Sequence, residues 1–350
     1  MPFTRHPFFI YSENENMIQP IWKDYIVDLN SSVEVSYYIA YIKNGSQNIF
    51  YSGVAQRKPD ESSTRICIND VCADWLISVF PSLADSFTAS ETPVEFVVAN
   101  DRTYEEYGRV RFINDWSYDK QHDAERDGLA APINGHIDSR QYLMWSGIDV
   151  EEAEADVTFT DGTTMKVFIP VAGSADFNED FNADFSKALR AAGSGTAVFP
   201  ISQWGDVAKV VVNGVQYDVV PGCSRYVLYY LNAYGGWDSF LIEGASVEQD
   251  NLTRHTMNKA GVLNRQTTNY QNDITKRITL HTSWLSDAQS LRMHHLLNST
   301  NVYLHDLERN EILPVIVEGT TTPYKTYKNQ GCKLFNYTID VTIAQERKRR

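Results

Sequence analysis

The sequence predicts a mainly β protein of tandem β-sandwich-like domains with one or two short helices. Aromatic residues make up 12% of the chain, with 20 Tyr against 6 Met, and this favours strands over a helical bundle. Short β-prone runs also recur, separated by Asn-Gly, Asp-Gly and Gly-Gly pairs that suit hairpin turns. With 350 residues and 43% hydrophobic content, the chain is long enough for two or three domains.

The strongest local signal is the stretch from Arg225 to Gly244, RYVLYYLNAYGGWDSFLIEG. Two apolar β-prone runs flank a segment with paired glycines, which can adopt positive φ, so the stretch predicts an aromatic β-hairpin. An isolated hairpin is barely stable in water, so we expect its aromatic side chains to pack on a second sheet or another subunit. The candidate assembly residues of this hairpin are Tyr226, Tyr229, Tyr230, Tyr234, Gly235, Gly236, Trp237 and Phe240.

An N-terminal β domain is predicted over residues 1–120. Its first hairpin pairs Val33–Ile42 with Asn48–Val54 through Asn44-Gly45, and a short helix follows from Asn69 or Asp70. Further strands are expected at Arg65–Ile68, Val94–Val98 and Arg109–Ile113. Residues 121–140 are polar and carry the charge cluster DKQHDAERD, so they are predicted to be a linker or exposed loop.

The middle β domain is predicted over residues 141–222, with hairpins at Val157–Ile169 and Lys209–Val220. Between them, Asp176 to Asp184 imitates the start of a calcium-binding EF-hand loop, but Phe181 and Lys187 stand where that loop needs Gly and Glu. Aromatic and aliphatic residues recur there every fourth position. The segment therefore predicts a helix near 177–190 in preference to a calcium site.

The C-terminal β domain is predicted over residues 223–350. Ser246–Asp273 is polar and rich in Asn and Thr, and the β pattern resumes at Ile274–Trp284. Ser286 and Gln289 form a plausible capping box for a helix near 286–298. The remaining strands are expected at Val302–His305, Ile312–Glu318 and Lys333–Ala344.

Charge and composition exclude several classes of function. The formal net charge of −14 argues against a nucleic-acid binder, whose affinity comes mainly from cations on phosphates. The first 15 residues lack the apolar length of a secretory signal, and no run approaches the roughly 20 apolar residues that span a bilayer. Of the four Cys, only Cys67 and Cys72 are close in sequence, and buried free thiols explain them better than a zinc site.

The sequence carries no enzyme signature. It has no G-x-S-x-G elbow, no H-E-x-x-H helix and no glycine-rich phosphate loop. His281, His294, His295 and His305 lie near one another in sequence, but their spacing suits no familiar metal site. We therefore expect no catalytic, cofactor-binding or metal-binding residues.

Five longer stretches carry a resemblance to known proteins: YYLNAYGGWDSFLIEG, TLHTSWLSDAQSLRMHHLLNSTNVYLHD (Thr279–Asp306), YKTYKNQGCKLFNYTIDVTIAQERKRR (Tyr324–Arg350), INDVCADWL (Ile68–Leu76) and FINDWSYD (Phe112–Asp119). They resemble structural proteins encoded by tailed phages and prophages of Bacteroides-like bacteria. The resemblance implies a virion component located in the tail and made in the bacterial cytoplasm. It transfers no catalytic residue.

These observations favour a structural tail subunit that self-assembles into a ring and contacts other tail proteins, without membrane insertion. Hairpins and exposed edges can complete sheets across subunits, and an acidic ring would not hold passing DNA. Two alternatives remain open. One is a glycan-binding β-sandwich or receptor-contact protein with Trp204, Trp237 or Trp284 as a stacking platform, and the other is a cryptic glycoside hydrolase.

Overall fold

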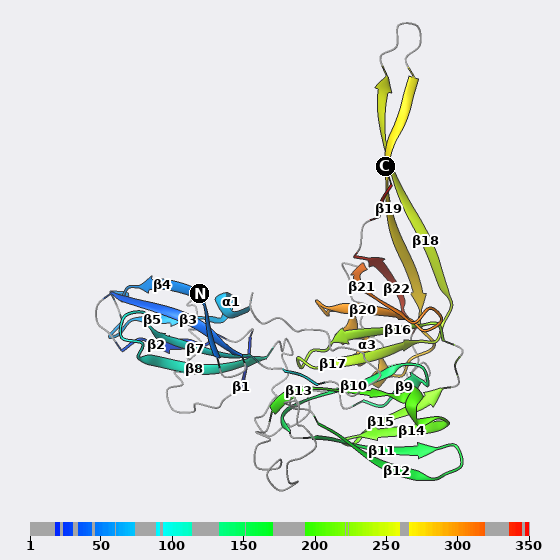
Figure 1. The fold of residues 1–350 in the computed structure, drawn as a ribbon, viewed down its shortest axis with the longest axis horizontal. Coiled ribbons are helices and arrows are strands. Elements are labelled where there is room, and N and C mark those ends of the chain that lie inside the picture. Colours follow the sequence, from blue (N-terminus) through cyan, green and yellow to red (C-terminus); the bar gives the residue numbers. More distant parts are fainter. Residues whose placement is uncertain are drawn as a thin grey trace, which may run out of the picture.

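The structure is a computed structural model, and it is mainly β as predicted. It describes residues 18–21, 24–30, 34–43, 46–59, 61–73, 89–91, 94–113, 133–150, 152–170, 193–220, 222, 224–259, 266–318, 336–344 and 347–349. Figure 1 shows three regions of sheet and one long hairpin that projects from them.

The N-terminal region is a five-stranded sheet covered on one face by a smaller layer. The sheet runs in the order β1 (Ile18–Pro20), β8 (Glu106–Ile113), β7 (Val94–Asn100), β3 (Val35–Lys43), β4 (Ser46–Ala55). The covering layer contains β2 (Ile26–Asp28), β5 (Arg65–Cys67) and helix α1 (Asn69–Ala73). Phe96 and Phe112 of the sheet pack with Val27 and Cys72 of that layer in one core.

The middle region is a β-sandwich. One sheet has the order β12 (Thr164–Pro170), β11 (Glu152–Phe159), β14 (Val207–Val212), β15 (Val215–Val220), β9 (Gly135–Asp138). The other has the order β10 (Tyr142–Val150), β13 (Gly193–Pro200), β6 (Ala89–Glu91), and the short 3-10 helix η1 (Ile201–Trp204) follows β13. Trp145 and Phe199 meet Val157 and Tyr217 between the two sheets.

The C-terminal region is an eight-stranded sheet with one helix against it. Its order is β17 (Trp237–Ile242), β16 (Tyr226–Leu231), β20 (Val302–Asp306), β21 (Glu311–Glu318), β22 (Thr338–Ile343), β19 (Gln266–His281), β18 (Ser246–Lys259), and β23 (Arg347–Arg349) also pairs with β19. Helix α3 (Asp287–Leu297) begins at the predicted capping box of Ser286 and Gln289.

The hairpin of β16 and β17 lies between two cores. On one face Tyr226, Leu228 and Tyr230 pack with α3 and the C-terminal sheet. On the other face, Tyr229 and Trp237 pack against the middle sandwich in a separate cluster that includes Met144 of β10 and Val198 of β13. The middle and C-terminal regions therefore share a buried core.

Strands β18 and β19 form a long antiparallel hairpin, which we call the arm (Figure 1). Their register runs from Ser246 opposite Leu280 at the base to Lys259 opposite Gln266, with one irregularity after His255. The polar composition of Ser246–Asp273 predicts an interruption of the β pattern, and this prediction is wrong. Alternation of apolar and polar residues marks only strands that bury one face.

Two further expectations need correction. The predicted linker at 121–140 ends in strand, because β9 pairs in parallel with β15. The predicted N-terminal domain contributes β6, which pairs with β13 of the middle sandwich. Both are pairings between distant segments, and local composition carries no information on the pairing partner. The segments proposed for the helix near 177–190 and for the calcium alternative lie outside the described residues, as do Cys223 and Cys332.

The turn signals correctly locate several positive-φ positions. Asn213-Gly214 connects β14 to β15 with φ of 43° and 86°, and Gly162 connects β11 to β12 with φ of 85°. In the central hairpin the positive φ belongs to Gly235, at 84°, and not to Gly236. Only one of the two central glycines is therefore required by backbone conformation.

We predict that Gly235→Ala destabilises the protein by about 1 to 2 kcal/mol, because a Cβ is disfavoured at this φ. Urea unfolding followed by tryptophan fluorescence measures the change. Gly108→Ala is the matched control, since a Cβ there would lie 3.4 Å from Val27 Cγ1, an ordinary contact. Equal stability of the two variants would contradict this role for Gly235.

Candidate assembly interface

The turn of the central hairpin is built around Asn232. Its backbone N–H donates to the Gly236 carbonyl at 2.8 Å, and its side-chain Oδ1 accepts from the N–H groups of Tyr234 and Gly236 at 2.9 and 3.0 Å. Asn232 is fully buried. A buried amide that satisfies turn N–H groups in this way holds one turn geometry, because any other would leave those donors unpaired.

The candidate assembly residues do not form an exposed contact surface. Within the single chain, all eight are buried: Tyr226, Tyr229, Tyr230, Tyr234, Gly235, Gly236, Trp237 and Phe240. The expectation that the hairpin packs on a second sheet is correct, but that sheet belongs to the same chain. These side chains are thus unavailable to a neighbouring subunit, and any assembly surface lies elsewhere.

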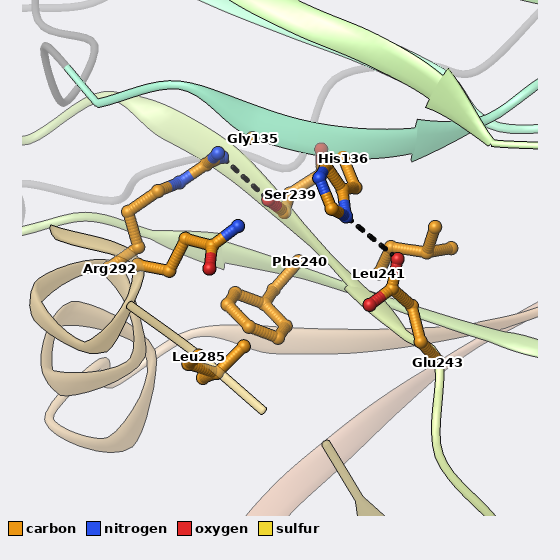
Figure 2. Close-up of a pocket in the computed structure, with 9 residues that line it drawn as sticks. Gly135, His136, Ser239, Phe240, Leu241, Glu243, Leu285 and Arg292 are labelled. Atoms are coloured by element: carbon orange, nitrogen blue, oxygen red, sulfur yellow. Dashed lines mark hydrogen bonds and ion pairs between the residues drawn. The ribbon is translucent and has the colours of Figure 1, made fainter. Parts of the chain in front are cut away.

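A buried ion pair ties this hairpin to α3 and to the middle sandwich. Arg292 of α3 donates from Nη2 to Asp238 Oδ1. The same Nη2 donates at 2.8 Å to the Ser239 carbonyl, a bond that Figure 2 shows. Its guanidinium carbon lies 5.5 Å from the centre of the Tyr217 ring of β15. A Cβ on residue 135 would lie 1.8 Å from Arg292 Nη1, so Gly135 of β9 makes room for the guanidinium.

The Arg292 guanidinium stays charged in the junction between α3, the central hairpin and β15 because it is paired with Asp238. Burial alone lowers the pKa of Arg292, but Asp238 and the nearby Tyr230 and Tyr217 raise it above its usual value, so the guanidinium stays charged. Burial raises the pKa of Tyr230 well above 10. The junction therefore holds a guanidinium and neutral phenols near neutral pH.

The arm carries exposed apolar side chains on both faces. Val247, Leu252, Met257 and Tyr270 are each about half exposed. The register places Val247 opposite Thr279 on one face and Leu252 opposite Ile274 on the other. Since β18 ends the described sheet order, its outer backbone edge is also open among the strands that the structure describes.

The arm is closer to electrical balance than the rest of the chain. Strands β18 and β19 contain four Lys or Arg and three Asp or Glu, whereas the whole chain has 31 basic and 45 acidic residues. The arm of one copy would therefore meet little charge repulsion from the acidic body of another.

Ion pairs anchor the arm at its base. Glu248 of β18 contacts Arg225 Nη2 at 2.7 Å, pairs with Lys276 of β19, and accepts from the Tyr226 hydroxyl at 2.6 Å. The bonds from Lys276 and Tyr226 lower the pKa of Glu248 to about 2. Arg277 similarly binds Asp340 of β22 at 2.7 Å. The base is held to the sheet, and the distal part remains available for contact.

Two other sheet edges expose apolar residues. Strand β4 ends the described order of the N-terminal sheet and exposes Ile49 and Val54, and β12 ends one middle sheet and exposes Phe168. No charged residue occurs in Ser46–Ala55. These edges are secondary candidates for strand addition by a partner.

The other predicted site residues are dispersed. Trp237 is buried, Trp204 packs partly buried against Phe199, and Trp284 is 65% exposed. His295 and His305 are buried and pack with different aromatic partners, Tyr234 and Tyr229. Cys72 is buried, and burial raises its thiol pKa to about 12, but Cys67 is exposed, contrary to expectation.

No helix among the described residues is long and apolar enough to cross a membrane. No protein-family model matches the chain, and no curated protein matches it significantly.

We predict that Asp238→Ala destabilises the protein by about 3 to 5 kcal/mol, because it leaves the Arg292 charge buried without its carboxylate. Chemical unfolding followed by circular dichroism measures the loss. The matched control is Lys166→Met, which breaks an exposed pair with Glu154 and should cost under about 1 kcal/mol. Similar losses in both variants would show that the Asp238 pair is not structural.

We also predict that stability falls as pH decreases from about 6.5 to about 4 because His295 is buried. Burial lowers the pKa of His295 to about 4, with Asp238 opposing and Arg292 assisting, while the unfolded value is about 6.5. The unfolded chain therefore binds more protons in this range, and the contribution is at most about 3 kcal/mol. Urea midpoints across this range should vary less in His295→Gln, and an unchanged slope would refute the assignment.

Proposed function

We propose that the chain is a structural subunit of a phage tail, in the tail tip, distal tail or an adaptor ring, acting by symmetric self-assembly and contact with neighbouring virion proteins. The observation that carries the proposal is the arm, a long hairpin that exposes apolar side chains on both faces. The resemblance of several stretches to tail proteins supplies the biological setting.

The exposed side chains of the arm favour a partner surface. Two-stranded ribbons gain little stability by themselves, and Leu252 and Tyr270 stay half exposed in the single chain. A neighbour that covered them would contribute about 1.5 to 3 kcal/mol for each large apolar side chain that it fully buries.

The charge distribution permits a second copy as that neighbour. The arm has four basic and three acidic residues, so it would meet little repulsion from the acidic body of another copy. The arm and its receiving surface would be different patches. Head-to-tail contacts of this type close into rings when the rotation between subunits permits.

In this proposal the protein is not an enzyme and uses no cofactor. It is made in the bacterial cytoplasm and becomes part of the virion tail. Because the chain is acidic overall, an assembled ring would not hold the phosphates of DNA that passed through it.

We predict that the double variant Leu252→Asn, Tyr270→Asn weakens self-association at least about 100-fold, because two apolar side chains lose their burial on the neighbour. Sedimentation velocity measures the association, and negative-stain microscopy shows whether rings form. The substitutions leave the net charge unchanged, so a weaker association would result from lost apolar contact and not from altered electrostatics.

Tyr104→Asn is the matched control for this experiment. Tyr104 is an exposed aromatic residue in the N-terminal region, and its positive φ of 61° suits Asn. It should assemble as the wild type does. A wild-type chain that stays monomeric at high concentration, or a double variant that assembles normally, would overturn the proposal.

A further inference from the structure

A hollow lies where the middle sandwich meets the start of α3. Its volume is about 450 Å³, within the range of small-ligand sites. Its lining is mostly polar and comes from β9 and the residues before it, from β15, and from the first turn of α3: Ile133, Asn134, Gly135, His136, Asp218, Ser286, Ala288 and Gln289. It is separate from the arm.

Two adjacent strands place a carboxylate and an imidazole side by side in this hollow. The parallel register of β15 and β9 sets Asp218 beside His136. Glu243 holds the His136 ring through a 2.8 Å contact with Nδ1, as Figure 2 shows, so the Nε2 edge is the one left to meet a ligand. Asp218 Oδ1 accepts from Gln216 Nε2 at 2.8 Å, which orients the carboxylate.

Trp284 is an exposed aromatic residue close in sequence to the lining of the hollow. It is 65% exposed and lies two residues before Ser286, which lines the hollow. Leu285 takes part in a β-bridge and is buried, and Ser286 has extended backbone angles, φ −70° and ψ 168°. Side chains alternate along an extended segment, so we infer that Trp284 lies on the side of Ser286, next to the hollow but outside the residues that line it.

We propose that this hollow binds a neutral sugar residue of a glycan. One face of the sugar ring would stack on Trp284, and its hydroxyl groups would donate to Asp218 and bond to His136 and Asn134. An aromatic platform beside a few convergent polar groups gives a site both contact area and orientation.

Charge selects the class of sugar. Asp218 lines the hollow, Asp287 lies in the first turn of α3, and the chain is acidic overall. An anionic sugar would meet like charges there, which raises the cost of binding. The site therefore fits uncharged hexoses or N-acetylhexosamines, and it does not depend on self-assembly.

The test is saturation-transfer difference NMR of the full-length protein with methyl glycosides of glucose, galactose, mannose and N-acetylglucosamine. We expect at least one glycoside to bind with a Kd of about 1 mM, a typical strength for one sugar residue in an open site. Trp284→Ala and Asp218→Asn should each weaken that binding at least about tenfold, as expected when a stacking face or a hydrogen-bonding carboxylate is lost.

The exposed aromatic variant Tyr104→Asn is the control and should bind as the wild type does. Trp284 and Asp218 are both exposed, so we expect their variants to fold. Circular dichroism of each variant checks this and so distinguishes lost binding from lost folding. The absence of binding by the wild type to all four glycosides, or equal binding by Trp284→Ala, would overturn the sugar site. Sedimentation of the same samples reports self-association separately, so failure of the sugar site is distinguishable from failure of the tail proposal.

Discussion

The burial of one hairpin on both faces is the constraint on which the rest of the structure depends. Strands β16 and β17 have no residue open to solvent, and their successive side chains alternate between the C-terminal core and the core shared with the middle sandwich. Each large side chain in such a position contributes about 1.5 to 3 kcal/mol through burial. Because side chains of this one hairpin belong to both cores, the middle and C-terminal regions are held together by side-chain packing as well as by the covalent chain.

The Asp238–Arg292 pair fixes how the middle and C-terminal regions are oriented where they pack together. Apolar packing is not directional, whereas the guanidinium must meet a carboxylate, a carbonyl and the Tyr217 ring at once. The approach of β9 is limited as well, because only a glycine at position 135 leaves space for Arg292. A buried ion pair of this kind is weak evidence for stability, and its contribution here is to the orientation of three elements.

The arm and the hollow are two separate surfaces with different chemistry. The arm extends from the edge of the C-terminal sheet opposite to β17 (Figure 1) and exposes apolar residues. The hollow at the start of α3 is polar and is lined partly by β9 and β15 of the sandwich. The arm could hold the subunit in an assembly, while the hollow remains accessible to a glycan. Ion pairs at Glu248 and Arg277 hold the base of the arm, so its position relative to the hollow is set by the fold.

The sequence by itself determined the mainly β class, the central hairpin with its glycine turn, the Asn213-Gly214 turn and the capped helix after Ser286. Each of these depends on residues close together in the chain, where φ preference, capping and β propensity act. Only the tertiary structure decided that the aromatic hairpin is buried within one chain, that β6 and β9 join the middle sandwich, and that a polar stretch forms the arm. Pairing and burial depend on segments far apart in sequence, and a run such as YVLYYL is apolar on both faces whether its second face meets another sheet or another subunit.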